Sequence, residues 1–350
     1  QCKADRAAGQ TGFCGAGRTL KAARAALHFW EEPCISGTRG SGTVFFSGCT
    51  LGCVFCQNYA ISAQGVGKPV TVERLGEIFR ELICQGAHNI NLVTPGHFAP
   101  WVARALEPPV EISHLKAIGR RNWRRAVPNM LRAMEKARAE GLDVSCDVYP
   151  YSAGSTQLIH VLPPESHAGG LEALTARLRA PEARAAIRRR METGADFENI
   201  TLLVGFENVR PTGLRTPEYA PYEGVPLSEI ARDRGQDPSA ALFDLLAAEG
   251  GTPGMIDTIA SEEDIAEILR APFSSVISDA TYPGTGLLHP RVTGMTAELL
   301  RHFVRERQDL TLEEAVNRLT LRPAERYGLA AKGRIALGAD ADLCLFDPEG

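Results

Sequence analysis

Apolar and polar positions alternate along this 350-residue chain with two different periods. At residues 70–85 and again at 128–140, apolar side chains recur at the spacing of an amphipathic helix. The apolar positions of the two segments are Val72, Leu75, Ile78, Phe79 and Ile83, and then Met130, Leu131, Met134 and Ala137. We therefore expect a helix with one apolar side in each segment.

Short apolar runs bounded by turn residues lie between further helical segments. The segments 239–249 and 262–269 are predicted helices. The expected strands are 44–46, 110–114, 142–147, 201–206, 255–260 and 275–279. Strands and helices that alternate at these lengths are typical of a parallel-sheet α/β architecture, and we expect part of a (β/α)8 barrel. The arginine-rich stretch 170–193 is expected to be a solvated helical insertion, with nucleic-acid binding as the alternative.

Composition places the chain among soluble globular proteins and limits its partners. Hydrophobic residues make up 44% of the chain, charged residues 23%, and the formal net charge is −4. Such a chain does not favour nucleic acid or a membrane surface, and no apolar run reaches the roughly 18–20 residues of a membrane span. The expected partner is a small-molecule substrate. The chain starts at Gln1-Cys2 without methionine, which indicates a missing upstream segment.

Cysteine is concentrated near the N-terminus, because seven of the nine cysteines lie within the first 84 residues. Cys49, Cys53 and Cys56 follow a predicted strand at the spacing C-x3-C-x2-C. Three thiolates on one loop can hold three irons of a 4Fe–4S cluster and leave the fourth iron open to a small molecule. A structural zinc loop or a chance grouping is the alternative, although zinc usually takes four protein ligands. Thiols clustered in this way indicate a reducing cytoplasm as the location.

The segment Cys49–Cys56 resembles the signature of the radical S-adenosylmethionine superfamily. Residues 5–17, 30–42 and 89–95 narrow the resemblance to the pyruvate formate-lyase activating enzyme-like branch. This resemblance covers residues 1–106 and implies a 4Fe–4S cluster and S-adenosylmethionine as cofactors. It implies cluster ligation by Cys49, Cys53 and Cys56, and contacts to S-adenosylmethionine from Asn89, Asn91 and Thr94 near a strand end.

Three polar residues end or follow predicted strands in the later part of the chain, where α/β barrels place their chemistry. His114 ends one strand, and a neutral imidazole is a good zinc ligand, although a lone strand-end histidine is often structural. Asp279 ends another strand, and a carboxylate there can deprotonate a metal-bound water and later protonate a leaving amine. Arg291 can clamp a carboxylate bidentately or form an ordinary salt bridge.

Motifs spread over residues 110–350 closely resemble the N-acyl-D-amino-acid deacylase (D-aminoacylase) group of the amidohydrolase superfamily. They are Ile112–Lys116, Asp147–Thr156, Ser278–Gly284, His289–Arg291, Leu310–Leu329 and Lys332–Phe346. The resemblance implies zinc-dependent hydrolysis of an N-acyl-D-amino acid to a carboxylate and a free D-amino acid. It implies His114 as a zinc ligand, Asp279 as general base and acid, and Arg291 and Tyr219 as contacts to the substrate carboxylate.

The two resemblances divide the chain into three expected parts. Residues 1–106 form a partial radical S-adenosylmethionine α/β segment, 107–330 a partial amidohydrolase barrel, and 331–350 a short β-hairpin from a β-sandwich. Pro108-Pro109 predicts an extended linker at the change. No two of the eight histidines are two residues apart, so the His-x-His pair that opens an amidohydrolase barrel is absent from this sequence.

Three interpretations of function therefore remain open. The first is an N-acyl-D-amino-acid deacylase whose zinc site is impaired. The second is an activating-enzyme-like radical S-adenosylmethionine protein, and the third is a chimeric fragment without activity.

Overall fold

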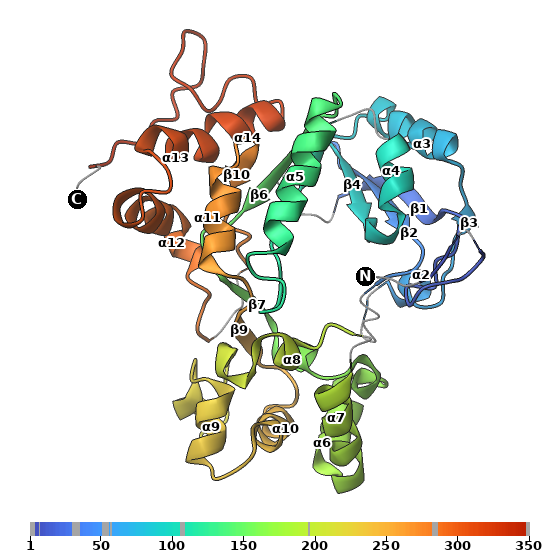
Figure 1. The fold of residues 1–350 in the computed structure, drawn as a ribbon, viewed down its shortest axis with the longest axis vertical. Helices are drawn as coiled ribbons and strands as arrows, with labels where there is room; N and C mark the ends of the chain where they lie inside the picture. Colours follow the sequence, from blue (N-terminus) through green and yellow to red (C-terminus); the bar gives the residue numbers. More distant parts are fainter. Residues whose placement is uncertain are drawn as a thin grey trace. The chain divides into compact units, whose positions relative to one another are not determined.

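The computed structural model describes residues 4–6, 8–29, 36–50, 56, 58–105, 109–194, 197–281 and 286–347. The chain divides into two compact units (Figure 1). Unit 1 combines residues 1–108 with 160–199, and unit 2 combines 109–159 with 200–350. None of the described helices is long and apolar enough to cross a membrane.

Unit 1 contains a four-stranded sheet in the order β3-β1-β2-β4. Its strands are β1 (Lys21–His28), β2 (Ser41–Phe46), β3 (Lys68–Pro69) and β4 (Ile90–Val93). Strand β1 is antiparallel to β2 and β3, whereas β2 and β4 are parallel. The parallel pair brings the residues that follow β2 and those that follow β4 to the same edge of the sheet.

Helix α3 (Val72–Cys84) confirms the first predicted helix and covers this sheet. The Thr71 side chain caps its start by accepting a hydrogen bond from the Arg74 amide at 3.1 Å. Leu75, Phe79 and Leu82 form the buried stripe, while Ile83 is 46% exposed. The expected inward position of Ile83 is therefore wrong, because Leu82 occupies the matching point of the helical repeat.

The remaining helices of unit 1 include α2 (Tyr59–Ser62) and α4 (Ala99–Ala105). The arginine-rich stretch is helical as expected, in two pieces, α6 (Gly170–Arg179) and α7 (Pro181–Thr193). Pro181 stands at the first turn of α7, where its missing N–H costs nothing. The break between the two helices follows from that proline.

Unit 2 contains a three-stranded parallel sheet in the order β10-β6-β5. Its strands are β5 (Val110–Ile112), β6 (Val144–Val148) and β10 (Ser274–Val276). Two helices that were predicted from their apolar spacing, α5 (Ala126–Ala139) and α11 (Glu262–Arg270), pack on it (Figure 1). Val148, Leu131 and Ile265 belong to the shared buried core.

Unit 2 also contains a separate antiparallel sheet in the order β7-β9-β8. Its strands are β7 (Ala153–Gln157), β8 (Val209–Thr212) and β9 (Gly254–Thr258). The strand predicted at 255–260 is present, but its neighbours run antiparallel to it. The α/β class is confirmed. Of the expected part of a (β/α)8 barrel, the described residues of unit 2 contain a three-stranded parallel sheet on which α5 and α11 pack.

One predicted strand is a helix. Residues 201–206 were expected to be extended, yet α8 (Ile200–Val204) occupies this stretch. A short apolar run cannot be assigned to strand or helix by periodicity alone. The following helices are α9 (Leu227–Asp233) and α10 (Pro238–Ala248), and the second of these matches its prediction.

The end of unit 2 is helical and then irregular. Helices α12 (Arg291–Glu298), the π-helical segment η6 (Leu299–Glu306), α13 (Leu312–Leu319) and α14 (Leu321–Arg326) precede residues 331–347, which contain no strand. Lys332 pairs with Asp340 at 2.8 Å and with Asp342, and Ile335 is 93% exposed. The β-hairpin expected here is therefore not present in 331–347, since an isolated hairpin without a covering sheet is marginal.

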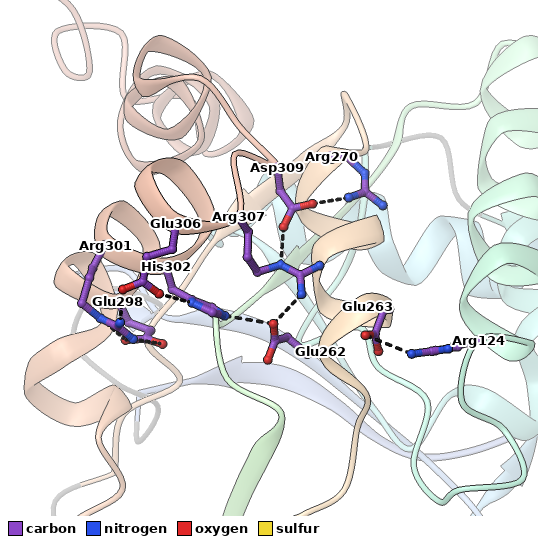
Figure 2. A network of polar contacts seen from close by, with 10 residues as sticks. All are labelled: Arg124, Glu262, Glu263, Arg270, Glu298, Arg301, His302, Glu306, Arg307 and Asp309. Atoms are coloured by element: carbon purple, nitrogen blue, oxygen red, sulfur yellow. Dashed lines mark hydrogen bonds and ion pairs between the residues drawn. The ribbon is translucent and has the colours of Figure 1, made fainter.

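A polar network joins α11 to η6 on the surface of unit 2 (Figure 2). The His302 ring lies between two carboxylates, with Nδ1 at 2.7 Å from Glu306 and Nε2 at 2.9 Å from Glu262. Arg307 also contacts Glu262 and pairs with Asp309 at 2.6 Å. These carboxylates raise the pKa of His302, and the network holds the π-helical segment against α11.

Candidate active site

Three loops of unit 2 leave the same edge of the parallel sheet. Because β5, β6 and β10 run in one direction, the residues that follow Ile112, Val148 and Val276 meet at that edge. Two of the loops contain residues in the left-handed region, His114 with φ 41° and Asp279 with φ 47°. Non-glycine residues rarely adopt this conformation, and its presence beside polar groups is typical of a functional site.

The Asp147 carboxylate of β6 organises the loop after β5. It is buried and accepts hydrogen bonds from the Ser113 hydroxyl at 3.1 Å and the His114 amide at 2.5 Å, both at Oδ1. The Leu115 amide donates to the Asp147 carbonyl oxygen at 2.9 Å. Burial raises the pKa of Asp147, and the two hydrogen bonds oppose that shift. This arrangement shapes the turn that carries His114 and Lys116.

Tyr149 lies directly after β6 with its ring fully buried. The Lys116 Nζ is 3.7 Å from the ring centroid and donates a hydrogen bond to the phenol oxygen. The Arg291 Cζ is 4.7 Å from the same centroid. Burial lowers the pKa of Lys116 to about 8 and raises that of Tyr149 to about 12. Two cations therefore contact one buried aromatic ring.

Arg291 and Asp279 are brought together, as the sequence analysis expected of a shared site. Arg291 Nη1 donates to Asp279 Oδ2 at 2.7 Å, and the side chains are 4% and 34% exposed. The buried Arg291 Nε has no hydrogen-bond partner within the described parts of the chain. A guanidinium buried to this extent with an unsatisfied donor is suited to a carboxylate ligand.

His289 fixes the start of α12, on which Arg291 lies. Its Nε2 hydrogen-bonds the Ala153 carbonyl at 3.1 Å, so Nε2 is the donor, and its Nδ1 accepts from the Arg291 amide at 3.0 Å. Burial, with the nearby Arg291 charge, lowers the pKa of His289 to about 4. The ring is therefore neutral and locks the backbone of Arg291 to strand β7. In the sequence, His289 belongs to the motif His289–Arg291, which by itself predicts no role for this side chain.

The expected zinc site is not assembled by the described residues. His114 is exposed, and only its main chain is held, by Asp147. Across residues 4–347, apart from the undescribed gaps, no group of three or more His, Cys, Asp or Glu side chains is placed to hold a metal ion. A catalytic zinc normally has three protein ligands, so these residues do not fit the ion.

Tyr219 does not join Arg291. Its buried ring lies under the Arg234 guanidinium, whose Cζ is 4.7 Å from the ring centroid. Burial raises the pKa of its hydroxyl, and the Arg234 charge opposes that shift. The assignment of Tyr219 as a second carboxylate contact stays a prediction, and the contacts of its ring are with Arg234 and Tyr222.

The residues expected to bind a cluster and S-adenosylmethionine lie in unit 1. Cys49 is buried just after β2 and Cys56 is half-buried, while Cys53 lies outside the described residues. Thr94 donates a hydrogen bond to the Phe46 carbonyl at 3.3 Å, which places it at the cysteine-bearing end of β2.

The two asparagines lie elsewhere along β4. Asn91 pairs with Thr43 in the middle of the strand. Asn89 lies at the opposite end, where its side chain accepts a hydrogen bond from Ser41 at 2.5 Å. Of the three residues expected to contact S-adenosylmethionine, Thr94 alone lies beside the cysteine loop. Asn89 is excluded from that edge by the parallel register.

Comparison with known proteins identifies the relatives of this chain. The profile described as "Amidohydrolase family" matches residues 84–350. An N-acyl-D-glutamate deacylase of Alcaligenes xylosoxydans xylosoxydans is 31% identical over 238 residues, covering 68% of this chain and 39% of that protein. A D-aminoacylase of the same organism is 30% identical over 247 residues, covering 71% of this chain and 41% of that protein.

A solved structure is similar as well. A D-aminoacylase studied for the functional role of its binuclear metal centre superposes with a TM-score of 0.52 and 26% identity. The alignment covers 79% of this chain and 50% of that one. The chain thus spans about two fifths of the length of the curated relatives it matches. None of these relatives is a radical S-adenosylmethionine protein, and the profile match begins within the segment that resembles one. From Cys84 to its last residue, this chain belongs to the amidohydrolase family.

Proposed function

We propose that this protein hydrolyses the amide bond of N-acyl-D-amino acids and releases a carboxylate and a D-amino acid. The relatives that carry these activities support the substrate class. The observation that carries the proposal is the buried Arg291, with an unsatisfied Nε, paired to the half-buried Asp279 at the carboxyl edge of a parallel sheet. In this pair, Arg291 can bind the substrate carboxylate and Asp279 beside it can transfer a proton.

Each of these residues has a definite task in the proposed reaction. Arg291 Nε donates to the substrate α-carboxylate, while Nη1 stays on Asp279 and keeps that carboxylate oriented. Asp279 accepts the proton of the attacking water and passes it to the leaving nitrogen. His289, neutral and bonded on both ring nitrogens, keeps Arg291 at its place. Zinc is given no task in this reaction scheme, because the described residues do not fit the ion.

The test is a stereospecific assay. Purified protein is incubated with N-acetyl-D-methionine or N-acetyl-D-glutamate, or with the L-enantiomers, with and without added zinc, and released amino acid is quantified. We expect release from the D-substrates only, with Asp279→Asn reducing kcat by about 10²-fold or more. Arg291→Lys should raise KM, because the single ammonium group of lysine cannot reproduce the fixed geometry by which the guanidinium binds Asp279 and the substrate carboxylate together.

A matched control is Arg121→Lys, since Arg121 is an exposed arginine of the same unit. It should leave both kinetic constants unchanged. If no D-amino acid is released under any of these conditions, the proposal is refuted.

A second candidate function concerns unit 1, where we propose that Cys49, Cys53 and Cys56 hold a 4Fe–4S cluster that binds S-adenosylmethionine. The parallel pairing of β2 with β4 supports this, because it brings Thr94 to the strand end from which the cysteine loop starts. Anaerobic reconstitution with iron and sulfide should give a brown protein, and Cys49→Ala should abolish the colour. Cys84→Ala, at the exposed end of α3, is the control. A colourless wild-type protein would exclude this function.

A further inference from the structure

The Glu223 carboxylate links two segments of unit 2 that are far apart in the chain. Its Oε1 accepts hydrogen bonds from the Gly213 amide at 2.8 Å and the Leu287 amide at 2.6 Å. Its Oε2 accepts one from the Leu214 amide at 2.9 Å. Gly213 and Leu214 directly follow β8, whereas Leu287 belongs to residues 286–290, the entry segment of α12. One side chain therefore holds the entry segment against the end of β8.

The main chain beside Glu223 is itself fixed to β8. The Gly224 amide donates to the Pro211 carbonyl at 2.9 Å, and Arg210 Nη1 donates to the Gly224 carbonyl at 3.0 Å. A glutamate on an unattached loop would move with the segment that it contacts. Because Glu223 is bound to a strand of the β7-β9-β8 sheet, its carboxylate is a fixed acceptor for the entry segment.

Close backbone packing joins the two segments at the same point. Gly286 has φ 91°, and a Cβ on it would lie 2.4 Å from the Gly213 nitrogen and 3.0 Å from Glu223 Oε1. Only glycine tolerates both this conformation and this approach. The entry segment therefore contacts the end of β8 through its main chain as well as through the carboxylate.

The entry segment has a second attachment to the same antiparallel sheet. Its first attachment is the Leu287 amide on Glu223, beside β8. The second is the His289 ring, whose Nε2 donates to the Ala153 carbonyl of β7. The Arg291 amide is bonded to the other nitrogen of that ring, and Arg291 is the first residue of α12. Two fixed points thus restrict the main chain that carries Arg291.

We propose that Glu223 is a positioning residue of the candidate active site, which holds the entry segment of α12 so that Arg291 can bind the substrate carboxylate. The inference rests on the proposed amide hydrolysis and extends it to a residue outside the parallel sheet and its loops. Hydrogen bonds to a charged acceptor are about twice as strong as neutral ones, so three amides on one carboxylate form a firm attachment. Since Glu223 acts through the main chain, its loss should weaken substrate binding and leave proton transfer by Asp279 unchanged.

Glu223→Ala is the direct test, with N-acetyl-D-methionine as substrate. Arg291 binds the carboxylate equally in the ground state and the transition state, so its displacement appears in KM. We expect KM to rise about 10-fold while kcat stays within about 3-fold of wild type. Glu223→Gln should restore KM to within about 3-fold of wild type, because its amide oxygen can replace Oε1 and accept from the Gly213 and Leu287 amides.

Glu249→Ala is the matched control. The Glu249 carboxylate accepts hydrogen bonds from the Arg215 amide at 3.0 Å and the Thr216 amide at 2.9 Å. Its removal loosens the loop after β8 but leaves the Leu287 amide on Glu223. We expect a KM within about 3-fold of wild type. Equal rises of KM in Glu249→Ala and Glu223→Ala would overturn the inference, because both would then report a general loosening of the loop.

Hydrogen exchange followed by mass spectrometry gives a readout that does not depend on activity. In Glu223→Ala, the peptide that contains Leu287 should exchange about 10-fold faster than in wild type, because its amide loses the acceptor and opens more often. Glu249→Ala should leave the exchange of that peptide unchanged. An unchanged rate in Glu223→Ala would refute the inference.

The outcomes separate this inference from the proposed function. If the wild-type protein releases no D-amino acid, both fall. If the wild type is active and Glu223→Ala keeps its KM, the inference alone is overturned. Should Glu223→Ala fail to fold by circular dichroism, Gly286→Ala decides, because its Cβ would displace the entry segment from Gly213 while the carboxylate remains. A wild-type KM in Gly286→Ala would then refute the inference.

Discussion

Asp147 offers a direct test of how the candidate active site is built. Asp147→Ala removes a buried carboxylate that accepts two hydrogen bonds at Oδ1, from the Ser113 hydroxyl and the His114 amide. Hydrogen bonds to a charged acceptor contribute about 1.5–3 kcal/mol each. The substitution also removes the free-energy cost of burying the carboxylate charge, and this offsets part of that loss. We therefore expect the free energy of unfolding to fall by about 3 kcal/mol.

Asp147→Asn separates hydrogen bonding from charge at the same position. The asparagine carbonyl oxygen can replace Oδ1 and keep both hydrogen bonds. We expect its free energy of unfolding to lie within about 1 kcal/mol of wild type. Asp143→Ala is the control, because this carboxylate is 59% exposed and water screens its ion pairs with Arg138 and Arg326, so that they contribute about 0–1 kcal/mol.

The difference in stability between Asp147→Asn and wild type should depend on pH. Burial raises the pKa of Asp147 above its ordinary value of 3.8, so the folded state holds this proton more tightly than the unfolded state. The resulting stabilisation is complete below pH 3.8 and is lost as pH rises through the folded pKa. Asparagine does not titrate. The stability of Asp147→Asn relative to wild type should therefore increase as pH rises across that window.

Urea unfolding followed by circular dichroism measures all three variants. At neutral pH we expect Asp147→Asn and Asp143→Ala to have free energies of unfolding near that of wild type. Asp147→Ala should be clearly less stable than both. If Asp147→Ala is as stable as Asp147→Asn, the two hydrogen bonds do not hold the loop after β5.

Three further predictions concern stability. Arg318→Ala should lower the free energy of unfolding by about 2–4 kcal/mol, because the buried guanidinium donates hydrogen bonds to carbonyls at the end of α11. Its Nε lies 2.6 Å from the Leu269 oxygen and its Nη2 3.1 Å from the Arg270 oxygen. An unchanged midpoint in urea unfolding would contradict this. His302→Gln should lower stability by less than about 1 kcal/mol, and only at pH below the raised imidazole pKa, since the stabilisation of a raised histidine is lost as pH rises through it. An equal effect above that pKa would disprove the ionic explanation. Gly48→Ala should lower the thermal midpoint, because φ at this position is 85° and the new Cβ would lie 2.3 Å from the Cys14 carbonyl oxygen. An unchanged thermal midpoint would refute this close approach.

The helices were predictable because their signal is local. The spacing of Leu131 and Met134 is enough to predict α5, and the buried core of the parallel sheet confirms it. Residues 201–206 failed because an apolar run of that length suits either a strand or a helix. Strand β9 was found, but its sheet was not, since its antiparallel partners lie about 50 and 100 residues away and leave no local trace.

Some residues of the candidate active site could be predicted from the sequence, and others could not. Asp279 and Arg291 were identified from their strand-end position and motif resemblance, and the structure pairs them. Lys116 and Tyr149 lie within motifs of the sequence, and the signal available for them is only that each follows a strand. The contact between the Tyr219 ring and Arg234 could not be predicted, because no local pattern in the sequence links the two residues.

The amino-acid sequence by itself determines the family, the types of most elements and the polar residues that follow the strands. It does so because periodicity, turn residues and motif spacing are properties of neighbouring positions. The tertiary structure alone decides which polar groups meet. The parallel pairing of β5, β6 and β10 brings Lys116, Tyr149 and Asp279 to one edge although they are far apart in the chain. Burial at that edge sets their charges and hydrogen-bond partners, and burial depends on contacts between distant segments.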